Sequence, residues 1–164
     1  MATSPLTRRD AFVLFGGAVA AACGAAAARA EAPAEAPVKA LVHRSPTCGC
    51  CGKWAERLKA AGFAVEVVNE PDMKPVKARL GVPEKLASCH TAEIGGYVIE
   101  GHVPIAAIER LLKEKPKAIG IAAPGMPAGS PGMETGGEQD VYEVVLFDAS
   151  GSRPFAKFQG DKPL

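Results

Sequence analysis

Hydrophobic positions in the first half of the chain change from a strand-like to a helix-like spacing and back again. Residues 38–45 and 63–70 are short apolar, β-branched runs, which predict two strands. Between them, apolar residues recur at helical spacing and a glycine follows in the position of a C-cap: Trp54, Leu58, Ala61 and Gly62. The pattern therefore predicts a strand, a helix and a second strand in this order.

The pattern continues with a short helix, a hairpin and a longer helix. Residues 73–83 predict a short helix that ends at its Gly and Pro. Within residues 89–101, Gly95 and Gly96 separate two apolar runs, as is typical of a β-hairpin. Residues 104–116 begin with a proline and carry one apolar face, formed by Ile105, Ile108, Leu111 and Leu112. The resulting order, β-α-β-α-β-β-α, predicts a thioredoxin-like α/β domain.

The last part of the chain adds a loop and two strands to this order. Residues 119–140 are rich in Gly and Pro and predict a long loop, which carries Met126 and Met133. Residues 141–159 predict two strands around an Asp-Ala-Ser-Gly-Ser turn. We therefore expect a thioredoxin-like domain with a C-terminal Met-containing loop and an extra β-hairpin.

The N-terminus has the layout of an export signal. Arg8 and Arg9 precede a run of small and apolar residues, and Ala28-Arg29-Ala30 offers a small-x-small cleavage site. The paired arginines suggest the twin-arginine route, but the dipeptide alone discriminates weakly, and the general secretory route stays open. A transmembrane anchor and a lipidated Cys23 are the alternatives, but the run is mostly Ala and Gly, and no Leu precedes Cys23 where a lipobox requires one. We therefore expect a periplasmic protein without a stable membrane anchor once the signal is cleaved.

These signals divide the chain into three parts. Residues 1–30 are the predicted export signal, and residues 31–38, rich in Pro, Ala and Glu, are a predicted flexible tether. Residues 39–164 are the predicted folded domain. Cleavage after Ala30 removes three arginines and one aspartate from the 19 basic and 18 acidic side chains and leaves a net charge of −1. This balance gives no electrostatic basis for binding nucleic acid or an anionic membrane.

Candidate chemistry is concentrated in the cysteines. The stretch SPTCGCCGKW holds Cys48, Cys50 and Cys51, and the later stretch SCHT holds Cys89 and His90. Cys48 and Cys51 have the Cys-x-x-Cys spacing of a dithiol redox site at a helix start, where the helix dipole favours thiolate. In a thioredoxin-like layout, the loop before the third strand abuts that site. We therefore expect Cys89 and His90 to lie against the three clustered cysteines.

Four thiolates and an imidazole form a site for a soft or borderline metal. Zinc accepts such ligands, but the tight Cys-Gly-Cys-Cys spacing suits sulfurs that bridge several Cu(I) ions. The loop methionines, Met126 and Met133, would supply thioether ligands that also select Cu(I). We predict copper as the metal, with several ions in each chain.

Alternatives remain open for most of these side chains. The four cysteines could form two structural disulfides, and the methionines could be hydrophobic contacts that hold the loop down. His90 could be a surface residue without a role. His102 is an accessory candidate, although a helix-entry residue without a metal is favoured for it. His43 is expected to be structural or exposed.

Three stretches together resemble a known family. SPTCGCCGKW, LASCHTAEIGGYVIEGHVP and GIAAPGMPAGSPGME are similar to the bacterial CopG-like copper-resistance proteins, which were long catalogued as a domain of unknown function. The resemblance covers about residues 39–158. It implies a periplasmic thioredoxin-like domain and a polynuclear Cu(I) site bridged by the four cysteines named above. Interconversion of Cu(I) and Cu(II), and transfer to copper exporters, are proposed for this group.

Three functions are therefore carried forward. The first is a copper-binding protein of copper resistance, with His90 as a terminal ligand and with periplasmic export or chaperone proteins as partners. The second is a thiol–disulfide oxidoreductase that uses Cys48 and Cys51 and does not need Cys50. The third is a structural zinc module. The sequence leaves open whether copper is only bound or is also turned over by an oxidoreductase.

Overall fold

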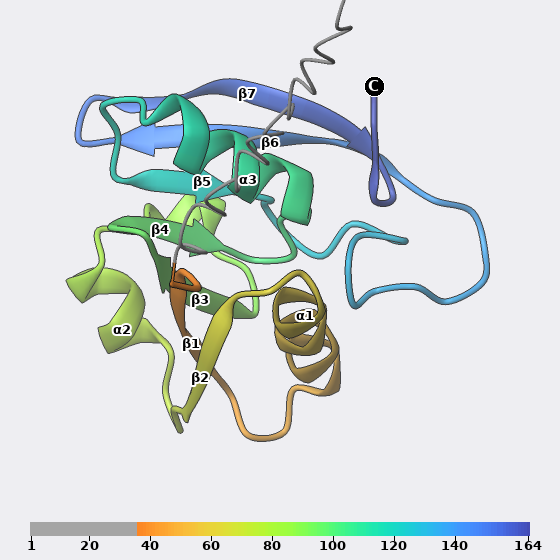
Figure 1. Ribbon diagram of the computed structural model, residues 1–164, viewed down its shortest axis with the longest axis horizontal. Coiled ribbons are helices and arrows are strands. Elements are labelled where there is room, and N and C mark those ends of the chain that lie inside the picture. Colours follow the sequence, from red (N-terminus) through yellow and green to blue (C-terminus); the bar gives the residue numbers. More distant parts are fainter. Residues whose placement is uncertain (1–35) are drawn as a thin grey trace, which may run out of the picture. The chain divides into compact units, whose positions relative to one another are not determined.

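The computed structural model describes residues 36–164, which form one mixed sheet flanked by helices (Figure 1). The helices are α1 (Gly49–Ala60), α2 (Lys74–Arg79), α3 (Ile105–Glu114) and the 3₁₀ turn η1 (Glu84–Leu86). The strands are β1 (Lys39–Arg44), β2 (Ala64–Asn69), β3 (His90–Ile94), β4 (Tyr97–Glu100), β5 (Gly120–Ala122), β6 (Val141–Asp148), β7 (Gly151–Gln159) and β8 (Lys162–Pro163). The predicted export signal, Cys23 and most of the predicted tether lie outside the described residues.

The eight strands are ordered β2-β1-β3-β4-β5-β6-β7-β8, and β2 to β7 follow one another from the lower part of Figure 1 to its top. β1 and β2 are parallel and joined by α1, whereas β3 runs antiparallel to β1 and forms a hairpin with β4. β4 and β5 are parallel, and β6, β7 and β8 follow as an antiparallel meander. The predicted β-α-β-α-β-β-α order is confirmed from β1 to α3, apart from the short turn η1, and the arrangement is compatible with a thioredoxin-like layout.

The prediction of a continuous loop over residues 119–140 is wrong at its start. Residues Gly120–Ala122 form β5, which pairs with β4 on one side and β6 on the other. Ile121 and Ala122 are fully buried, so their backbone groups need partners within the sheet. A strand of three residues beside a Gly/Pro-rich segment is too short to show alternation, and only its neighbours in the sheet reveal it. The two-residue strand β8 was not predicted either.

Apolar residues cover both faces of the sheet because successive strand residues point to opposite sides. On one face α1 and α3 pack on a core that contains Ala40, Val42, Trp54, Leu58, Ala92, Ile94, Ile99, Ile108, Leu111, Ile121, Val144, Leu146 and Phe158. On the other face the segment around η1 packs on a smaller core of Val82, Leu86, Val98, Ala122 and Phe147. The sheet is thus fixed from both sides and holds the ends of β1 and β3 in register.

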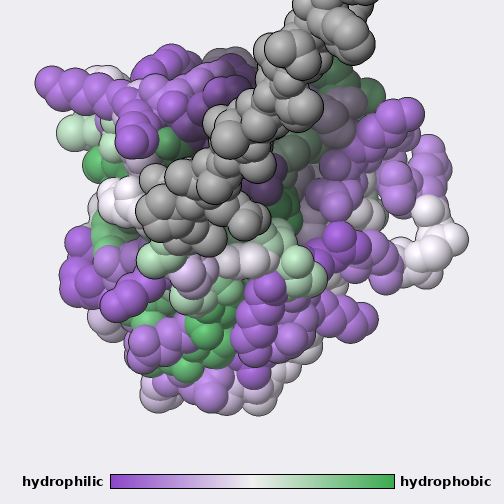
Figure 2. All heavy atoms as spheres, viewed as in Figure 1, coloured by the Kyte–Doolittle hydropathy of each residue, from purple (hydrophilic) through white to green (hydrophobic). Residues whose placement is uncertain are grey.

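Figure 2 shows one face of the molecule, which is mainly hydrophilic. On the face drawn in Figure 2, hydrophobic surface gathers in the region of β1 and β2, between hydrophilic side chains. Val67 of β2 is 39% exposed. Within residues 36–164, no helix combines the length and the apolar character needed to cross a bilayer.

Candidate metal centre

The turn between β1 and α1 positions the first three cysteines. The N–H of Cys48 donates a hydrogen bond to the Ser45 carbonyl at 3.1 Å, which closes the turn. Arg44, the last residue of β1, donates from Nη1 to the Cys48 carbonyl at 2.8 Å. Cys48 is the N-cap of α1, so Cys50 and Cys51 lie in its first turn. Their sulfurs are therefore held at a helix N-terminus, where negative charge is favoured.

Strand pairing brings Cys89 to the same place. His90 pairs with Arg44 across β1 and β3, so Cys89 lies beside the turn that follows β1. The Cys89 carbonyl oxygen is 3.9 Å from Cys51 Sγ. The geometry agrees with the expectation that Cys89 and His90 lie against the clustered cysteines, although they are about forty residues away in the sequence.

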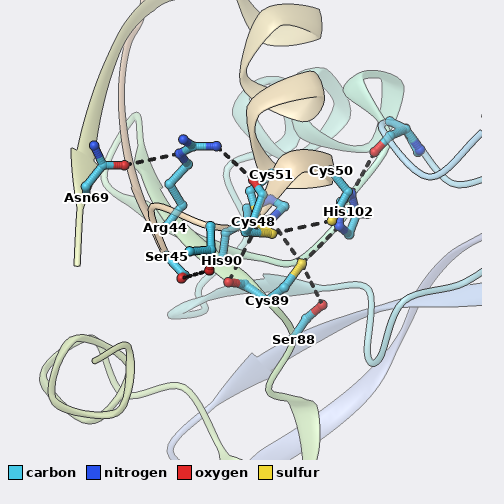
Figure 3. Close-up of a disulfide and its surroundings, with 12 residues drawn as sticks. Arg44, Ser45, Cys48, Cys50, Cys51, Asn69, Ser88, Cys89, His90 and His102 are labelled. Atoms are coloured by element: carbon cyan, nitrogen blue, oxygen red, sulfur yellow. Dashed lines mark hydrogen bonds between the residues drawn. A yellow bond between two sulfur atoms is a disulfide. The ribbon is translucent and has the colours of Figure 1, made fainter. Parts of the chain in front are cut away.

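The four sulfurs lie together (Figure 3). The Sγ atoms of Cys48, Cys50, Cys51 and Cys89 are all within 4.8 Å of one another. Cys48 and Cys51 are joined by a disulfide, whereas Cys50 and Cys89 are free, half-buried thiols. The distance from Cys48 Sγ to Cys50 Sγ is 3.4 Å. The alternative of two structural disulfides is therefore wrong for the described residues, because the second pair stays reduced.

His102 lies in the site, although a helix-entry residue without a metal was favoured for it from the sequence. Its Nε2 lies 3.0 Å from Cys89 Sγ, and its Nδ1 lies 2.7 Å from the Pro131 carbonyl oxygen. The β3–β4 register could have revealed this position. Thr91 pairs with Glu100, so two further steps along the antiparallel hairpin place residue 102 opposite residue 89. The hairpin predicted from its two glycines therefore already implies that residues 89 and 102 lie opposite each other.

His90 is completely buried, so the alternative of a surface histidine is wrong. Its ring lies 4.4 Å from the Trp54 ring and 4.8 Å from the His102 ring, centroid to centroid. Its Nδ1 is 3.6 Å from Cys89 Sγ, and its Nε2 has no hydrogen-bond partner among the described residues. Burial, with help from His102, lowers the pKa of His90 well below its usual value. The imidazole is therefore neutral, which is the form that binds metals.

The free thiol of Cys89 is kept protonated by its surroundings. Burial, followed by the neighbouring Cys50, raises the pKa of Cys89 from 9.0 to about 11. Burial also lowers the pKa of His102. A metal ion would reverse the state of the thiol, since coordination deprotonates a cysteine and releases its proton.

A buried polar group fixes the backbone just before Cys89. The Glu100 carboxylate is fully buried and accepts hydrogen bonds from the Ser88 N–H at 2.6 Å and the Thr91 hydroxyl at 2.6 Å. Lys77 Nζ lies 2.5 Å from the same carboxylate. Because every carboxylate oxygen has a partner, this cluster ties α2 and β4 to the residue before Cys89.

The Gly/Pro-rich loop packs against the start of α1. Gly132 has a φ of +87°, and a Cβ at this position would lie 2.7 Å from the Cys50 carbonyl oxygen. Glu134 accepts a hydrogen bond from the Gly132 N–H at 2.9 Å and forms an ion pair with Arg57 of α1 at 2.5 Å. Of the predicted thioether ligands, Met126 is 58% exposed, while Met133 is partly buried. The loop thus reaches the site chiefly through the Pro131 carbonyl and Gly132.

His43 lies elsewhere and is structural. It is buried in β1, with Nδ1 3.0 Å from a Glu70 oxygen and Nε2 3.3 Å from a Glu93 oxygen. Both ring nitrogens are thus occupied by carboxylates, and His43 belongs to neither of the ligand groups formed around Cys89.

Comparisons with known proteins agree with this geometry. Residues 86–133 match the family described as "Protein of unknown function, DUF411". No curated protein matches the chain. Two solved structures, "Copper resistance protein copG- Form 1" and "Form 2", are both 49% identical to the chain with a TM-score of 0.71. The first match covers 76% of this chain and 99% of the solved one, and the second covers 74% and 98%. The chain therefore belongs to the CopG family of copper resistance proteins.

Proposed function

We propose that this protein is a periplasmic copper-binding protein of copper resistance, which holds several Cu(I) ions bridged by its four clustered cysteines. The copper ions are its cargo, and His90 is a terminal ligand. The observation that carries the proposal is the grouping of the sulfurs of Cys48, Cys50, Cys51 and Cys89 within 4.8 Å. Thiolates select Cu(I), and sulfurs this close suit bridging between low-coordinate ions.

The surroundings of the cysteines support the same function. Two buried imidazoles, His90 and His102, lie next to Cys89 and add nitrogen ligands to the sulfurs. The four-sulfur site requires the reduced form, because the disulfide occupies Cys48 and Cys51. Loading therefore begins when a thiol reductant gives two electrons and two protons to that bond and becomes a disulfide itself, and the loaded site can hand copper to periplasmic export or chaperone proteins.

An anaerobic Cu(I) titration tests this function. A Cys23→Ser chain, in which all four remaining cysteines are reduced, should bind several Cu(I) ions and protect all four thiols from alkylation. A Cys50→Ser, Cys89→Ser double variant should lose most of this capacity, because only two sulfurs remain to bridge ions. Full stoichiometry in the double variant would refute the cysteine-bridged site. Tight binding of one Zn²⁺ in preference to copper would instead favour a structural zinc module.

The thioether ligands need a separate test. Met133 adjoins the Gly132 contact with α1, so Met133→Leu should accelerate transfer of Cu(I) to a chelator if the sulfur covers the site. Met73→Leu is the matched control, because Met73 precedes α2 and is partly buried. Equal transfer rates in the two variants would assign Met133 to packing alone.

A second candidate function is a thiol–disulfide oxidoreductase. The observation that favours it is the Cys48–Cys51 disulfide itself, in Cys-x-x-Cys spacing at the start of α1. This function predicts that the metal-free, reduced protein reduces a disulfide substrate and that Cys50→Ser retains the rate. Failure to turn over such a substrate, with copper capacity intact, would leave copper binding as the function.

A further inference from the structure

The disulfide uses two sulfurs of the site but leaves a second set of ligands intact. Cys50 and Cys89 are free thiols, and their Sγ atoms lie within 4.8 Å of each other. Cys89 Sγ is also 3.0 Å from His102 Nε2. Cys50 and His102 therefore both lie next to the sulfur of Cys89, and none of these three side chains takes part in the disulfide (Figure 3).

The Gly/Pro-rich loop after β5 orients the His102 ring so that one nitrogen can act as a ligand. The Pro131 carbonyl can only accept a hydrogen bond, so the 2.7 Å contact requires the proton to be on His102 Nδ1. Nε2 then presents its lone pair toward Cys89. A second hydrogen bond of this kind fixes the tautomer and the ring orientation of most metal-binding histidines.

His90 is a second buried imidazole beside Cys89. Its side chain is fully buried, and Nε2 has no hydrogen-bond partner among the described residues. The nitrogen that faces Cys89 is Nδ1, which lies 3.6 Å from Sγ.

The chemistry of this reduced ligand set suits one soft ion. Two thiolates and one imidazole satisfy Cu(I), which accepts low coordination numbers and prefers sulfur. His90 could complete a four-ligand set for Zn²⁺, so the choice of Cu(I) rests on the preference of this ion for thiolates. With Cys48 and Cys51 bonded to each other, two of the four bridging sulfurs are lost, so the disulfide form should hold fewer ions than the reduced form.

We propose that the Cys48–Cys51 disulfide divides the copper site rather than abolishing it. In the disulfide form one Cu(I) is held by Cys50, Cys89 and His102, and in the reduced form the four sulfurs hold several ions. This inference rests on the proposed function. The disulfide would then act as a redox control of copper capacity, releasing the bridged ions while keeping one.

The change between the two forms needs an oxidant of the small-disulfide class. One thiolate of the reduced pair attacks the oxidant's S–S bond, and the second thiolate then attacks the mixed disulfide. The Cys48–Cys51 bond forms, the oxidant accepts two electrons and leaves as two thiolates, and these take up two protons from solvent. Copper stays Cu(I) throughout, and the ions that lose their bridging sulfurs are released.

The experiment compares the two forms of one protein. A Cys23→Ser chain is prepared with the disulfide formed by oxidised glutathione, leaving two free thiols, and separately with all four thiols reduced. Each form is titrated anaerobically with Cu(I) against bicinchoninate, a chromogenic Cu(I) chelator. We expect one ion per chain in the disulfide form and several in the reduced form. X-ray absorption of the disulfide form should show sulfur and nitrogen neighbours on the same copper.

Variants assign the ligands. In the disulfide form, His102→Ala should lower Cu(I) affinity at least about tenfold, because even outer partners of a binding histidine are worth about 10- to 100-fold. His43→Gln is the control, since His43 is a buried histidine of β1 that belongs to neither ligand group. A Cys48→Ser, Cys51→Ser variant should bind one ion whether or not reductant is present. Near-ultraviolet circular dichroism of Trp54 checks that each variant is folded.

The outcomes separate the inference from the proposed function. A disulfide form that binds no copper, or more than one ion, overturns the inference even if the reduced form binds several. The same holds if His102→Ala and His43→Gln bind equally well. A reduced form that binds no more ions than the disulfide form refutes the proposed function and the division of the site together.

Discussion

The side chain of Cys89 lies where the sulfur group and the two buried histidines meet. Its sulfur is 3.0 Å from His102 Nε2 and 3.6 Å from His90 Nδ1. The same burial that brings these groups together removes the water that would stabilise a thiolate. Cys89 is therefore a poor nucleophile in the metal-free protein, although its sulfur is well placed to bind a soft metal.

The pH dependence of alkylation tests this state. With a pKa of about 11, Cys89 holds about 100-fold less thiolate between pH 7 and 8 than a thiol with the ordinary value of 9.0. The folded-state pKa is raised, so thiolate appears only as the pH rises toward that value. The iodoacetamide rate at Cys89, followed by peptide mass spectrometry in the disulfide form, should still increase tenfold per pH unit up to pH ~10. A plateau below pH ~9 would contradict the effect of burial.

Glu100 shows how one buried charge supports the site without taking part in its chemistry. Its carboxylate binds the Ser88 N–H, Lys77 and Thr91, and so connects α2, β3 and β4 next to Cys89. Removing one partner of a buried ion pair costs more than the pair contributes, because the other charge is left without a counter-ion.

Glu100→Gln should therefore lower the free energy of unfolding by about 3 kcal/mol. This value is near the low end of the cost of breaking a buried ion pair, because Lys77 is partly exposed. Glu114→Gln is the control, since it breaks the exposed pair between Arg110 and Glu114 of α3 and should cost about 0.5 kcal/mol or less. Urea unfolding measures both changes. Similar losses in the two variants would mean that the Glu100 cluster adds nothing beyond a surface pair.

At the scale of elements, the loop after β5 is seated on the first turn of α1. The close approach at Gly132 requires a residue without a side chain, because a Cβ would meet the backbone of both Cys50 and Trp54. The Arg57–Glu134 ion pair holds the neighbouring residues, and the Pro131 carbonyl reaches His102. The loop therefore couples the N-terminus of α1 to the orientation of an imidazole in the site.

Gly132→Ala should move this part of the loop away from the first turn of α1, because the added Cβ would collide with its backbone. Gly136→Ala is the matched control, because Gly136 also has a positive φ, of +77°, but has no atoms within 4 Å of a Cβ position. Both changes should cost about 1–2 kcal/mol in backbone strain, while only Gly132→Ala should make the loop sensitive to limited proteolysis. Equal protease resistance in the two variants would show that the contact with α1 is not tight.

At the scale of the whole molecule, the β6–β7 hairpin is part of the core rather than an appendage. β6 pairs with β5 and covers both cores, with Val144 and Leu146 on one face and Val145 and Phe147 on the other. β5 in turn pairs with β4, which carries Glu100 at its end. The stability of the site's backbone therefore depends on strands far from the cysteines in the sequence.

Truncating Phe147, one of the two buried aromatic residues of the hairpin, tests this dependence. Phe147 is fully buried, so Phe147→Ala should lower the free energy of unfolding by about 3–5 kcal/mol. Phe155→Ala in β7 should cost clearly less, because Phe155 is only partly buried and packs under the Arg110 guanidinium. Chemical denaturation followed by Trp54 fluorescence compares them. A Phe147→Ala loss no greater than that of Phe155→Ala would make the hairpin peripheral.

The sequence by itself determined the elements and the chemical type of the site. Hydrophobic spacing reports on the few residues around each position, which is why α1, α3 and the β3–β4 hairpin could be predicted from Trp54, Ile108 and the Gly95-Gly96 pair. The residue types likewise predicted the chemistry of the site, because four cysteines and the adjacent His90 form a ligand set for a soft metal.

Only the tertiary structure decided what depends on pairing between distant segments. β5 exists because β4 and β6 provide its hydrogen bonds, and His90 is buried because Trp54 and His102 close around it. The Cys48–Cys51 disulfide leaves Cys50 and Cys89 reduced and so divides the ligands into two sets. These outcomes depend on register and distance across the sheet, which residue spacing within one segment does not encode.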